Sequence, residues 1–204
     1  MSEKFVVTIT REFGSMGRPI ARLMAEMLDI EYYDRDIVDE TAKSLNLPVS
    51  VVSNEEEAAR NFFNMKYPLG RGTSEIQDNI FSAQQKVMNE LVDKHSCIIV
   101  GRCSDYLFKD HKNSLHIYIY APYEKRLENC VNSLFLKPEE AKKTISEVDK
   151  ARTYYHMHYA GYLPYDYKHK DLMIDSSILG INGTAEYLVD MIKRRFRLDE
   201  EKSG

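Results

Sequence analysis

One stretch near the N-terminus decides the fold class of this chain: FVVTITREFGSMGRPI, residues 5–20. The β-branched run at its start predicts a strand over residues 5–9, and the glycines at positions 14 and 17 predict a tight turn. Apolar residues then recur at helical spacing, at Ile20, Leu23, Met24, Met27 and Leu28. The stretch therefore predicts a strand, a turn and a helix in succession.

The rest of the chain continues this alternation of strands and helices. Short apolar runs predict further strands at residues 30–33, 97–100, 115–120 and 172–174. Periodicity and helix-ending residues predict helices at 34–45, 76–95, 122–134, 138–155 and 184–196. Because strands separated by helices are joined by crossovers, we expect an α/β fold with one five-stranded, mainly parallel sheet flanked by helices.

Composition favours a single soluble domain. A length of 204 residues is enough for one core, and 43% hydrophobic with 29% charged residues is typical of a globular protein. No apolar run approaches the roughly 20 residues that span a bilayer. The N-terminal residues lead directly into the first strand, so we expect a cytoplasmic protein and no membrane partner.

Cysteine content and charge exclude other classes of site. The three cysteines, Cys97, Cys103 and Cys130, lack paired spacing, which argues against a disulfide framework or a zinc knuckle. A net charge of −4 gives no reason to expect nucleic acid as a partner. The basic cluster at residues 193–197 is best interpreted as a complement to the negative end of the last helix. Any phosphate-binding site is therefore expected to consist of a few residues close together and not of a broad basic surface.

The turn after the first strand is the candidate for such binding. It consists of Gly14, Ser15, Met16, Gly17 and Arg18. In a parallel sheet this turn presents unpaired backbone N–H groups and the positive end of a helix at the carboxyl edge of the strands. The glycines allow a close approach of the backbone, and arginine adds a fixed charge. A plain strand-to-helix connection is the alternative.

The turn departs from the P-loop pattern G-x-x-x-x-G-K-[ST] at three positions. Glu12 stands where the first glycine belongs, Arg18 replaces the lysine, and Pro19 replaces the hydroxyl residue that ligates magnesium. Ser15 could supply a hydroxyl from another point of the loop. The pattern is therefore that of an altered P-loop.

Five segments together resemble the cytidylate kinase-like family, a divergent branch of the P-loop nucleoside monophosphate kinases. They are ITREFGSMGR at 9–18, YYDR at 32–35, IVGR at 99–102, DKAR at 149–152 and DSSILGI at 175–181. The resemblance implies a three-layer P-loop nucleoside-kinase-like domain over residues 1–198. Within it we expect an acceptor-side insert at about 34–75 and a lid-like region at about 138–170, followed by a frayed tail at 199–204.

The resemblance also implies an acceptor site formed by Asp34 and Arg102. Asp34 follows the second strand, where an acidic residue faces the acceptor, although it could also cap the following helix. Arg102 follows the third strand and would clamp the acceptor phosphate, with a surface ion pair as the alternative. Cys103 replaces the aspartate that cytidylate kinases proper carry after this arginine, which leaves the acceptor base open.

Cations near the end of the lid-like helix complete the predicted machinery. Lys150 and Arg152 could swing onto the transferring phosphoryl group, although a solvated helix face is the alternative. Arg126 could be a further nucleotide contact or a helix-surface charge. His156 and His158 are spaced i, i+2 and point to different faces of a helix, so no metal site is expected there.

The resulting hypothesis is transfer of the ATP γ-phosphoryl group to a nucleoside monophosphate, with CMP or dCMP as the first guess. Arg18, Lys150 and Arg152 are the predicted catalytic cations, and Mg²⁺ would be bound through the nucleotide phosphates. The missing lysine and hydroxyl keep a non-catalytic nucleotide- or phosphate-binding module open, because fold alone does not imply catalysis. A kinase for another small acceptor is the third possibility.

Overall fold

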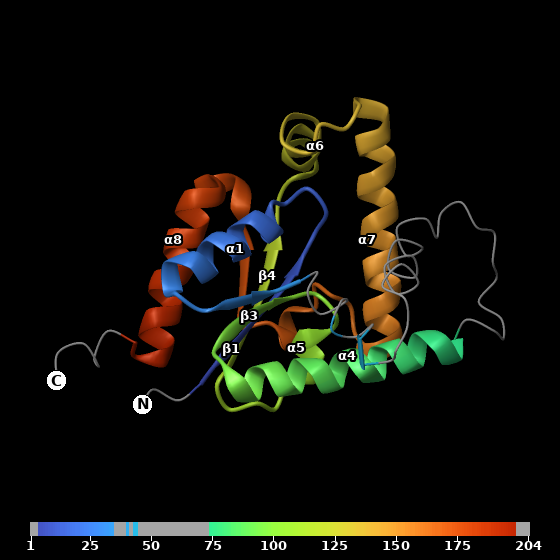
Figure 1. Ribbon diagram of the computed structural model, residues 1–204. Coiled ribbons are helices and arrows are strands. Elements are labelled where there is room, and N and C mark those ends of the chain that lie inside the picture. Colours follow the sequence, from blue (N-terminus) through green and yellow to red (C-terminus); the bar gives the residue numbers. More distant parts are fainter. Residues whose placement is uncertain (1–3, 35–39, 41–42, 45–73, 199–204) are drawn as a thin grey trace.

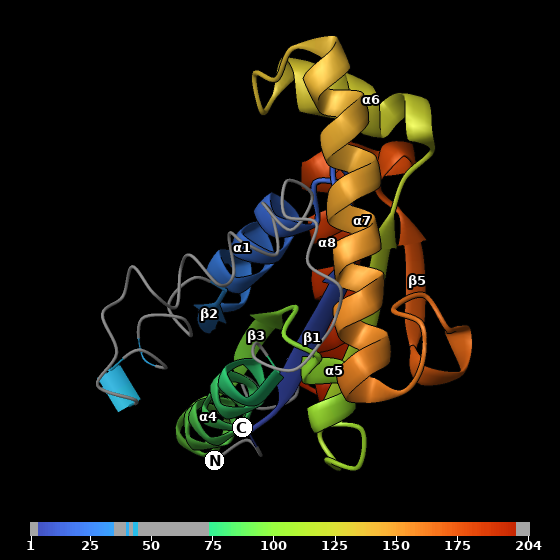
Figure 2. The same ribbon diagram turned by 90° about the vertical axis from the view of Figure 1, so that its right-hand side faces the viewer.

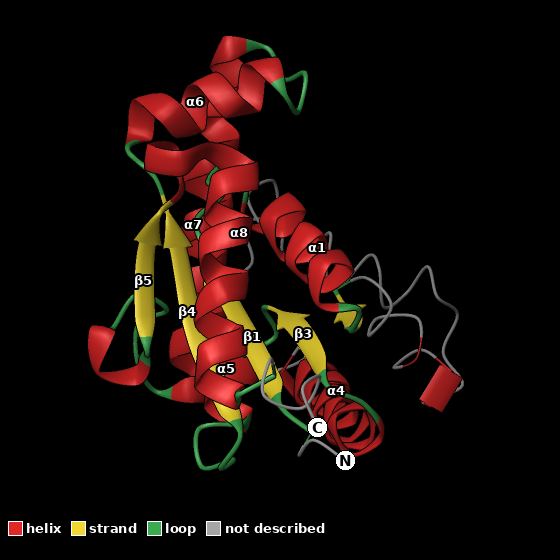
Figure 3. Cartoon of the chain, turned by 90° about the vertical axis from the view of Figure 1, so that its left-hand side faces the viewer, coloured by secondary structure: helices red, strands yellow, loops and turns green. Residues whose placement is uncertain are grey.

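A single sheet of five parallel strands forms the centre of the molecule. The computed structural model describes residues 4–34, 40, 43–44 and 74–198. The strands lie in the order β2-β3-β1-β4-β5 (Figure 3). They are β1 (Val6–Arg11), β2 (Glu31–Tyr33), β3 (Cys97–Val100), β4 (Ser114–Tyr120) and β5 (Leu172–Asp175). The predicted five-stranded α/β fold is confirmed.

Helices cover both faces of this sheet. Helices α1 (Gly17–Leu28) and α8 (Ser176–Phe196) lie together on one face (Figure 1). On the other face lie α4 (Ser74–Lys94), α5 (Ser104–Leu107) and the long α7 (Pro138–Ala160), as Figure 2 shows. Helix α6 (Tyr123–Asn132) follows β4 and packs against α7, and a 3-10 turn, η1 (Tyr167–His169), precedes β5. The three-layer arrangement is therefore present.

Alternation along the central strands explains why both faces are covered. On β1, Val7 and Ile9 pack into the cluster formed with α1 and α8, whereas Val6 packs with Met88 of α4 on the opposite face. Strand β3 alternates in the same way. Since successive side chains of a strand point to opposite faces, a strand that is apolar at every position must be buried on both.

Two helix boundaries differ from the predicted ones by five residues or more. Helix α8 begins at Ser176 and not at residue 184, because Asp175 caps it by accepting a bond from the Ser177 N–H at 2.8 Å. A non-helical residue, Gly180, interrupts this helix, so the apolar periodicity along the sequence does not extend back to its first turn. Helix α7 continues to Ala160 and ends at Gly161 in a left-handed conformation.

Some predicted elements cannot be compared with the structure. The helix expected at 34–45, most of the insert at 34–75 and the tail at 199–204 lie outside the described residues. Within the described part of the chain, none of the helices combines the length and apolar character that crossing a bilayer requires.

A buried histidine in β4 gives the fold a predicted sensitivity to acid. The ring of His116 lies 2.7 Å from the Thr8 hydroxyl and 3.2 Å from the Ser114 hydroxyl. Burial lowers the pKa of His116, and the nearby charge of Asp171 only partly opposes this. Protonation therefore favours the unfolded chain, and stability is expected to fall as the pH drops below about 6.5.

Urea unfolding at about pH 7.5 and pH 5.5 measures this effect. The substitution His116→Gln is expected to reduce the loss of stability between the two values, whereas His95→Gln at an exposed position should leave it unchanged. An equal loss in wild type and His116→Gln would show that other groups control the acid response.

Candidate functional site

Steric constraints explain both glycines of the predicted phosphate-binding turn. Gly14 has φ +78°, and a Cβ there would lie 2.7 Å from the carbonyl oxygen of Arg126. A Cβ on Gly17 would lie 2.8 Å from the Cβ of Arg11. Met16 precedes α1 in a left-handed conformation, with φ 59°. The turn therefore has a specific, tightly packed conformation that other residues at positions 14 and 17 would disturb.

The backbone amides of this turn form the first half of the candidate site. Among the residues that the structure describes, no acceptor receives a hydrogen bond from the N–H groups of residues 14–18. These donors stand at the N-terminus of α1, where the helix dipole also favours negative charge. Such an arrangement suits an anion, and above all a phosphate.

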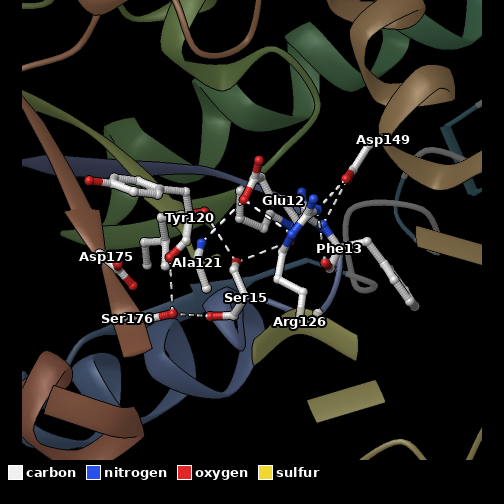
Figure 4. Close-up of polar contacts among 12 residues, drawn as sticks. Glu12, Phe13, Ser15, Tyr120, Ala121, Arg126, Asp149, Asp175 and Ser176 are labelled. Carbon is white, nitrogen blue, oxygen red and sulfur yellow. Dashed lines mark hydrogen bonds and ion pairs between the residues drawn. The ribbon is translucent and has the colours of Figure 1, made fainter. Parts of the chain in front are cut away.

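The Ser15 side chain contacts the backbone of neighbouring segments. This buried residue places its hydroxyl 3.0 Å from the Glu12 carbonyl oxygen and 3.1 Å from that of Ile119. The Ser176 hydroxyl in turn donates to the Ser15 carbonyl oxygen at 2.7 Å (Figure 4). The Ser15 hydroxyl thus links the turn to β4 by a hydrogen bond, and the Ser176 hydroxyl links it to α8. The sequence analysis assigned no role to Ser176.

Arg126 connects the turn to the two helices beyond the sheet edge. Its guanidinium group pairs with Asp149 of α7 and lies 3.4 Å from the Glu12 carboxylate (Figure 4). Asp149 also accepts a bond from the Phe13 N–H at 2.8 Å, and Glu12 accepts one from the Ala121 N–H at 3.2 Å. Arg126 is only 11% exposed, so it is not a helix-surface charge.

Burial raises the pKa of the Glu12 carboxyl group, and the nearby charge of Arg126 only partly opposes this. Glu12, which replaces the first P-loop glycine, therefore has a structural role, because it links the turn to the segment after β4. The sequence offered no sign of this link, since Glu12 and Ala121 lie 109 positions apart.

Asp34 is the centre of the second half of the site. Its buried carboxylate pairs with Arg18 and lies 4.0 Å from Arg11. Burial disfavours the charged form, but the charges of Arg11, Arg18 and Arg102 outweigh it and lower the pKa of Asp34. The structure thus brings three predicted site residues, Arg18, Asp34 and Arg102, to one place. The cap alternative for Asp34 depends on residues 35–39, which lie outside the described part.

Arg11 also belongs to this candidate site, and the sequence analysis missed it. It ends β1, and its side chain is 14% exposed. Burial lowers its pKa; Asp34 opposes this, while the like charges of Arg102 and Arg18 add to it. A Cβ on Gly101 would collide with the Arg11 guanidinium, so glycine at position 101 makes room for it. An arginine at the last position of a central parallel strand is a signal that could have identified it.

Arg102 reaches this cluster from a strained turn. Gly101, Arg102 and Cys103 all have positive φ, at 80°, 59° and 53°. For a residue with a side chain this conformation costs about 1–2 kcal/mol. Such strain persists only where the surroundings hold it, and it is most frequent at functional sites.

The lid-like helix contributes one of its two predicted cations to the site. The Arg152 guanidinium donates to the Arg11 carbonyl oxygen at 3.0 Å, and burial, followed by the charge of Arg11, lowers its pKa strongly. Lys150, two residues earlier, is exposed. Asp34 therefore interacts electrostatically with four arginines, at positions 11, 18, 102 and 152, and Arg152 also interacts with Asp149. This excess of positive charge, part of it buried, is suited to a phosphate with more than one negative charge.

Two histidines of α7 contact carboxylate groups. His156 contacts Asp105 and His158 lies 3.6 Å from Asp78. Within the described ranges, no three His, Cys, Asp or Glu residues come together as a metal site.

Comparisons with known proteins identify the family and the fold of the chain. The model of the cytidylate kinase-like family matches residues 6–178. A comparison with curated proteins returns no significant match.

Similar solved structures share the fold. The crystal structure of an uncharacterized protein from Eubacterium ventriosum is 21% identical, with a TM-score of 0.68, over 95% of this chain and 99% of that one. Shikimate kinase from Bacteroides thetaiotaomicron is 10% identical, with a TM-score of 0.53, over 93% and 96%. Shikimate kinase from Acinetobacter baumannii, in complex with shikimate, is 15% identical, with a TM-score of 0.50, over 94% and 92%. These neighbours establish a P-loop kinase fold.

Proposed function

Since this chain belongs to the cytidylate kinase-like family, we propose that it is an ATP-dependent phosphotransferase whose acceptor is a nucleoside monophosphate. Family membership and the P-loop kinase fold support a nucleotide-binding phosphotransferase. CMP or dCMP is the first acceptor to test.

One observation carries the proposal: four arginines interact electrostatically with Asp34, beside the amides of residues 14–18, which have no acceptor among the described residues. Phosphoryl transfer requires in-line positioning of two phosphates and neutralisation of the charge between them. A row of amides next to a cluster of guanidinium groups supplies both, since amides hold phosphate oxygens and guanidinium groups bind them in pairs.

Each predicted residue then has a task. The amides of residues 14–18 and the Arg18 side chain would hold the donor phosphates. Asp34 and Arg102 would organise the acceptor, and Arg11 would join Arg102 at its phosphate. Lys150 and Arg152 of the lid-like region would close over the transferring group and exclude water.

In the part of the chain that the structure describes, the turn offers no hydroxyl ligand for magnesium at the usual P-loop position. Pro19 occupies the position of the P-loop hydroxyl ligand, and the Ser15 hydroxyl faces two backbone carbonyl oxygens. We therefore propose that Mg²⁺ arrives bound to the ATP phosphates, where it would neutralise part of their charge.

The test is ADP formation from ATP and magnesium with a panel of nucleoside monophosphates. Shikimate belongs in the panel because a structural neighbour is in complex with it, and turnover with shikimate alone would favour a kinase for another small acceptor. If no acceptor gives turnover but ATP or a monophosphate raises the melting temperature, the chain is a binding module, because a ligand that binds only the native state stabilises it.

The two lid cations are expected to differ in importance. Arg152→Ala should lower kcat about 100-fold or more, because its buried guanidinium already lies beside Arg11. Lys150→Ala should lower kcat about tenfold or less, because Lys150 is exposed and must move to reach the phosphoryl group. Steady-state kinetics of the two variants measure the difference. Equal losses would mean that both cations reach the phosphoryl group in the closed state.

A further inference from the structure

A buried charged cluster lies directly after the strained turn that carries Arg102. Its centre is Asp105 at the start of α5, which is only 2% exposed. The Asp105 carboxylate lies 3.0 Å from the Nε2 atom of His156, accepts a bond from the Tyr162 hydroxyl at 3.0 Å, and pairs with Lys170. The Lys170 side chain is fully buried.

The cluster joins three segments that are distant in the sequence. Asp105 follows β3, His156 belongs to the lid-like helix α7, and Lys170 directly follows η1. The remaining ring nitrogen of His156, Nδ1, lies 2.8 Å from the Tyr162 carbonyl oxygen. The carboxylate thus has donors from three directions, which leaves it little freedom to move.

Stability alone is a weak explanation for such a cluster. Burying an ion pair costs desolvation energy, and an apolar replacement of the same shape is often as stable. Burial by itself raises the pKa of Asp105, but the bonds from His156 and Lys170 prevail and hold it low. The carboxylate stays charged and keeps its partners, so it is suited to holding backbone in a fixed position.

The backbone that this cluster would keep in place is the left-handed turn at residues 101–103, directly before α5. Arg102 and Cys103 are both left-handed, and Cys103 is the N-cap residue of α5. Without support from the surroundings, residues with side chains leave this conformation. Relaxation of the turn would carry the Arg102 guanidinium away from Arg11 and Asp34.

We infer that Asp105, His156 and Lys170 are positioning residues that hold the left-handed turn and thereby keep Arg102 aimed at the acceptor phosphate. This inference rests on the proposed function, in which Arg102 binds that phosphate. It also connects the lid-like helix to the acceptor side of the site, because His156 belongs to α7.

A double-mutant cycle tests the inference. Isothermal titration measures binding of CMP, of inorganic phosphate and of ATP to the wild type, Asp105→Asn, Arg102→Ala and the double variant. We expect Asp105→Asn to weaken binding of CMP and phosphate about tenfold and to change ATP affinity less than about twofold. In the Arg102→Ala background the same substitution should change CMP and phosphate binding less than about twofold, because coupled residues are not additive.

Two further variants separate positioning from general loosening. Asp78→Asn removes the carboxylate that Tyr159 of α7 contacts at an exposed site, and CMP affinity should stay within about twofold. Tyr162→Phe removes one donor to Asp105 and is the milder probe if Asp105→Asn does not fold; it should weaken CMP and phosphate binding about twofold to threefold.

The outcomes separate this inference from the proposed function. Additive effects of Asp105→Asn and Arg102→Ala, or a lower melting temperature with unchanged CMP and phosphate affinity, would overturn the positioning role. If the wild type binds phosphate but no nucleoside monophosphate, the proposed acceptor is wrong, and the phosphate titrations still decide whether Asp105 acts through Arg102.

Discussion

Gly14→Ala is expected to abolish nucleotide binding and to lower the stability of the fold by about 2–4 kcal/mol. Two effects add at this position. An alanine is strained at φ +78°, and its Cβ would lie 2.7 Å from a backbone oxygen of Arg126 and 2.9 Å from the sulfur of Cys130. Because the first of these is backbone, the clash moves the turn or α6, and the amides of residues 14–18 lose their alignment.

The matched control is Gly161→Ala. Gly161 has nearly the same φ, +80°, but nothing lies within 4 Å of the position that a Cβ would take. Only the strain remains, so a loss of about 1–2 kcal/mol with unchanged ATP affinity is expected. Urea unfolding and ATP titration compare the two variants. If both lose ATP binding to the same extent, the clash with α6 is not the cause.

Asp34→Asn is expected to destabilise the free protein by roughly 2–4 kcal/mol and to make its stability depend on phosphate. The substitution removes the carboxylate with which all four arginines interact, and uncompensated charges in a partly buried site are costly. The loss should be smaller than for a fully buried pair, because the Arg18 side chain is 55% exposed. Added pyrophosphate should restore part of the stability by replacing the missing negative charge.

The pH dependence of the wild type follows from the same residue. Its pKa is lowered in the folded protein, so the contribution of Asp34 is complete above the unfolded value of about 3.9 and is lost as the pH falls through the lower folded value. Asp34→Asn should lack this component in acid unfolding.

Asp190→Asn is the control for Asp34→Asn. Asp190 pairs with Arg194 on the exposed surface of α8, and its loss should cost less than about 0.5 kcal/mol with no response to pyrophosphate. If pyrophosphate stabilises Asp34→Asn no more than the wild type, the arginine cluster does not bind phosphate.

Much of the site could be predicted because its parts stand at the ends of strands. The family resemblance implied that Asp34 and Arg102, which both follow parallel strands, belong to one site, and the structure does bring them together. The task of each residue stays a prediction. Arg11 obeys the same rule and was missed, because it lies inside the stretch that was interpreted only as strand and turn.

Other contacts could not be predicted from neighbouring positions in the sequence. Arg152 donates to the backbone of Arg11 from 141 positions away, and Arg126 finds Glu12 and Asp149 on different elements. The sequence left Arg126 open between a nucleotide contact and a surface charge, and only the packing of α6 over the turn makes it an internal link.

The sequence by itself determined the order of strands and helices and the glycine-bearing turn, because neighbours two to four positions apart encode periodicity and turn conformation. Only the tertiary structure decided that Arg11 and Arg152 lie together beside the other charges of the site. Arg152 lies on α7 and Asp105 after β3, and their surroundings depend on how the helices pack against the sheet. The turn from Gly14 to Arg18 could therefore be predicted from the sequence alone, whereas the place of Arg11 in the arginine cluster and its contact with Arg152 could not.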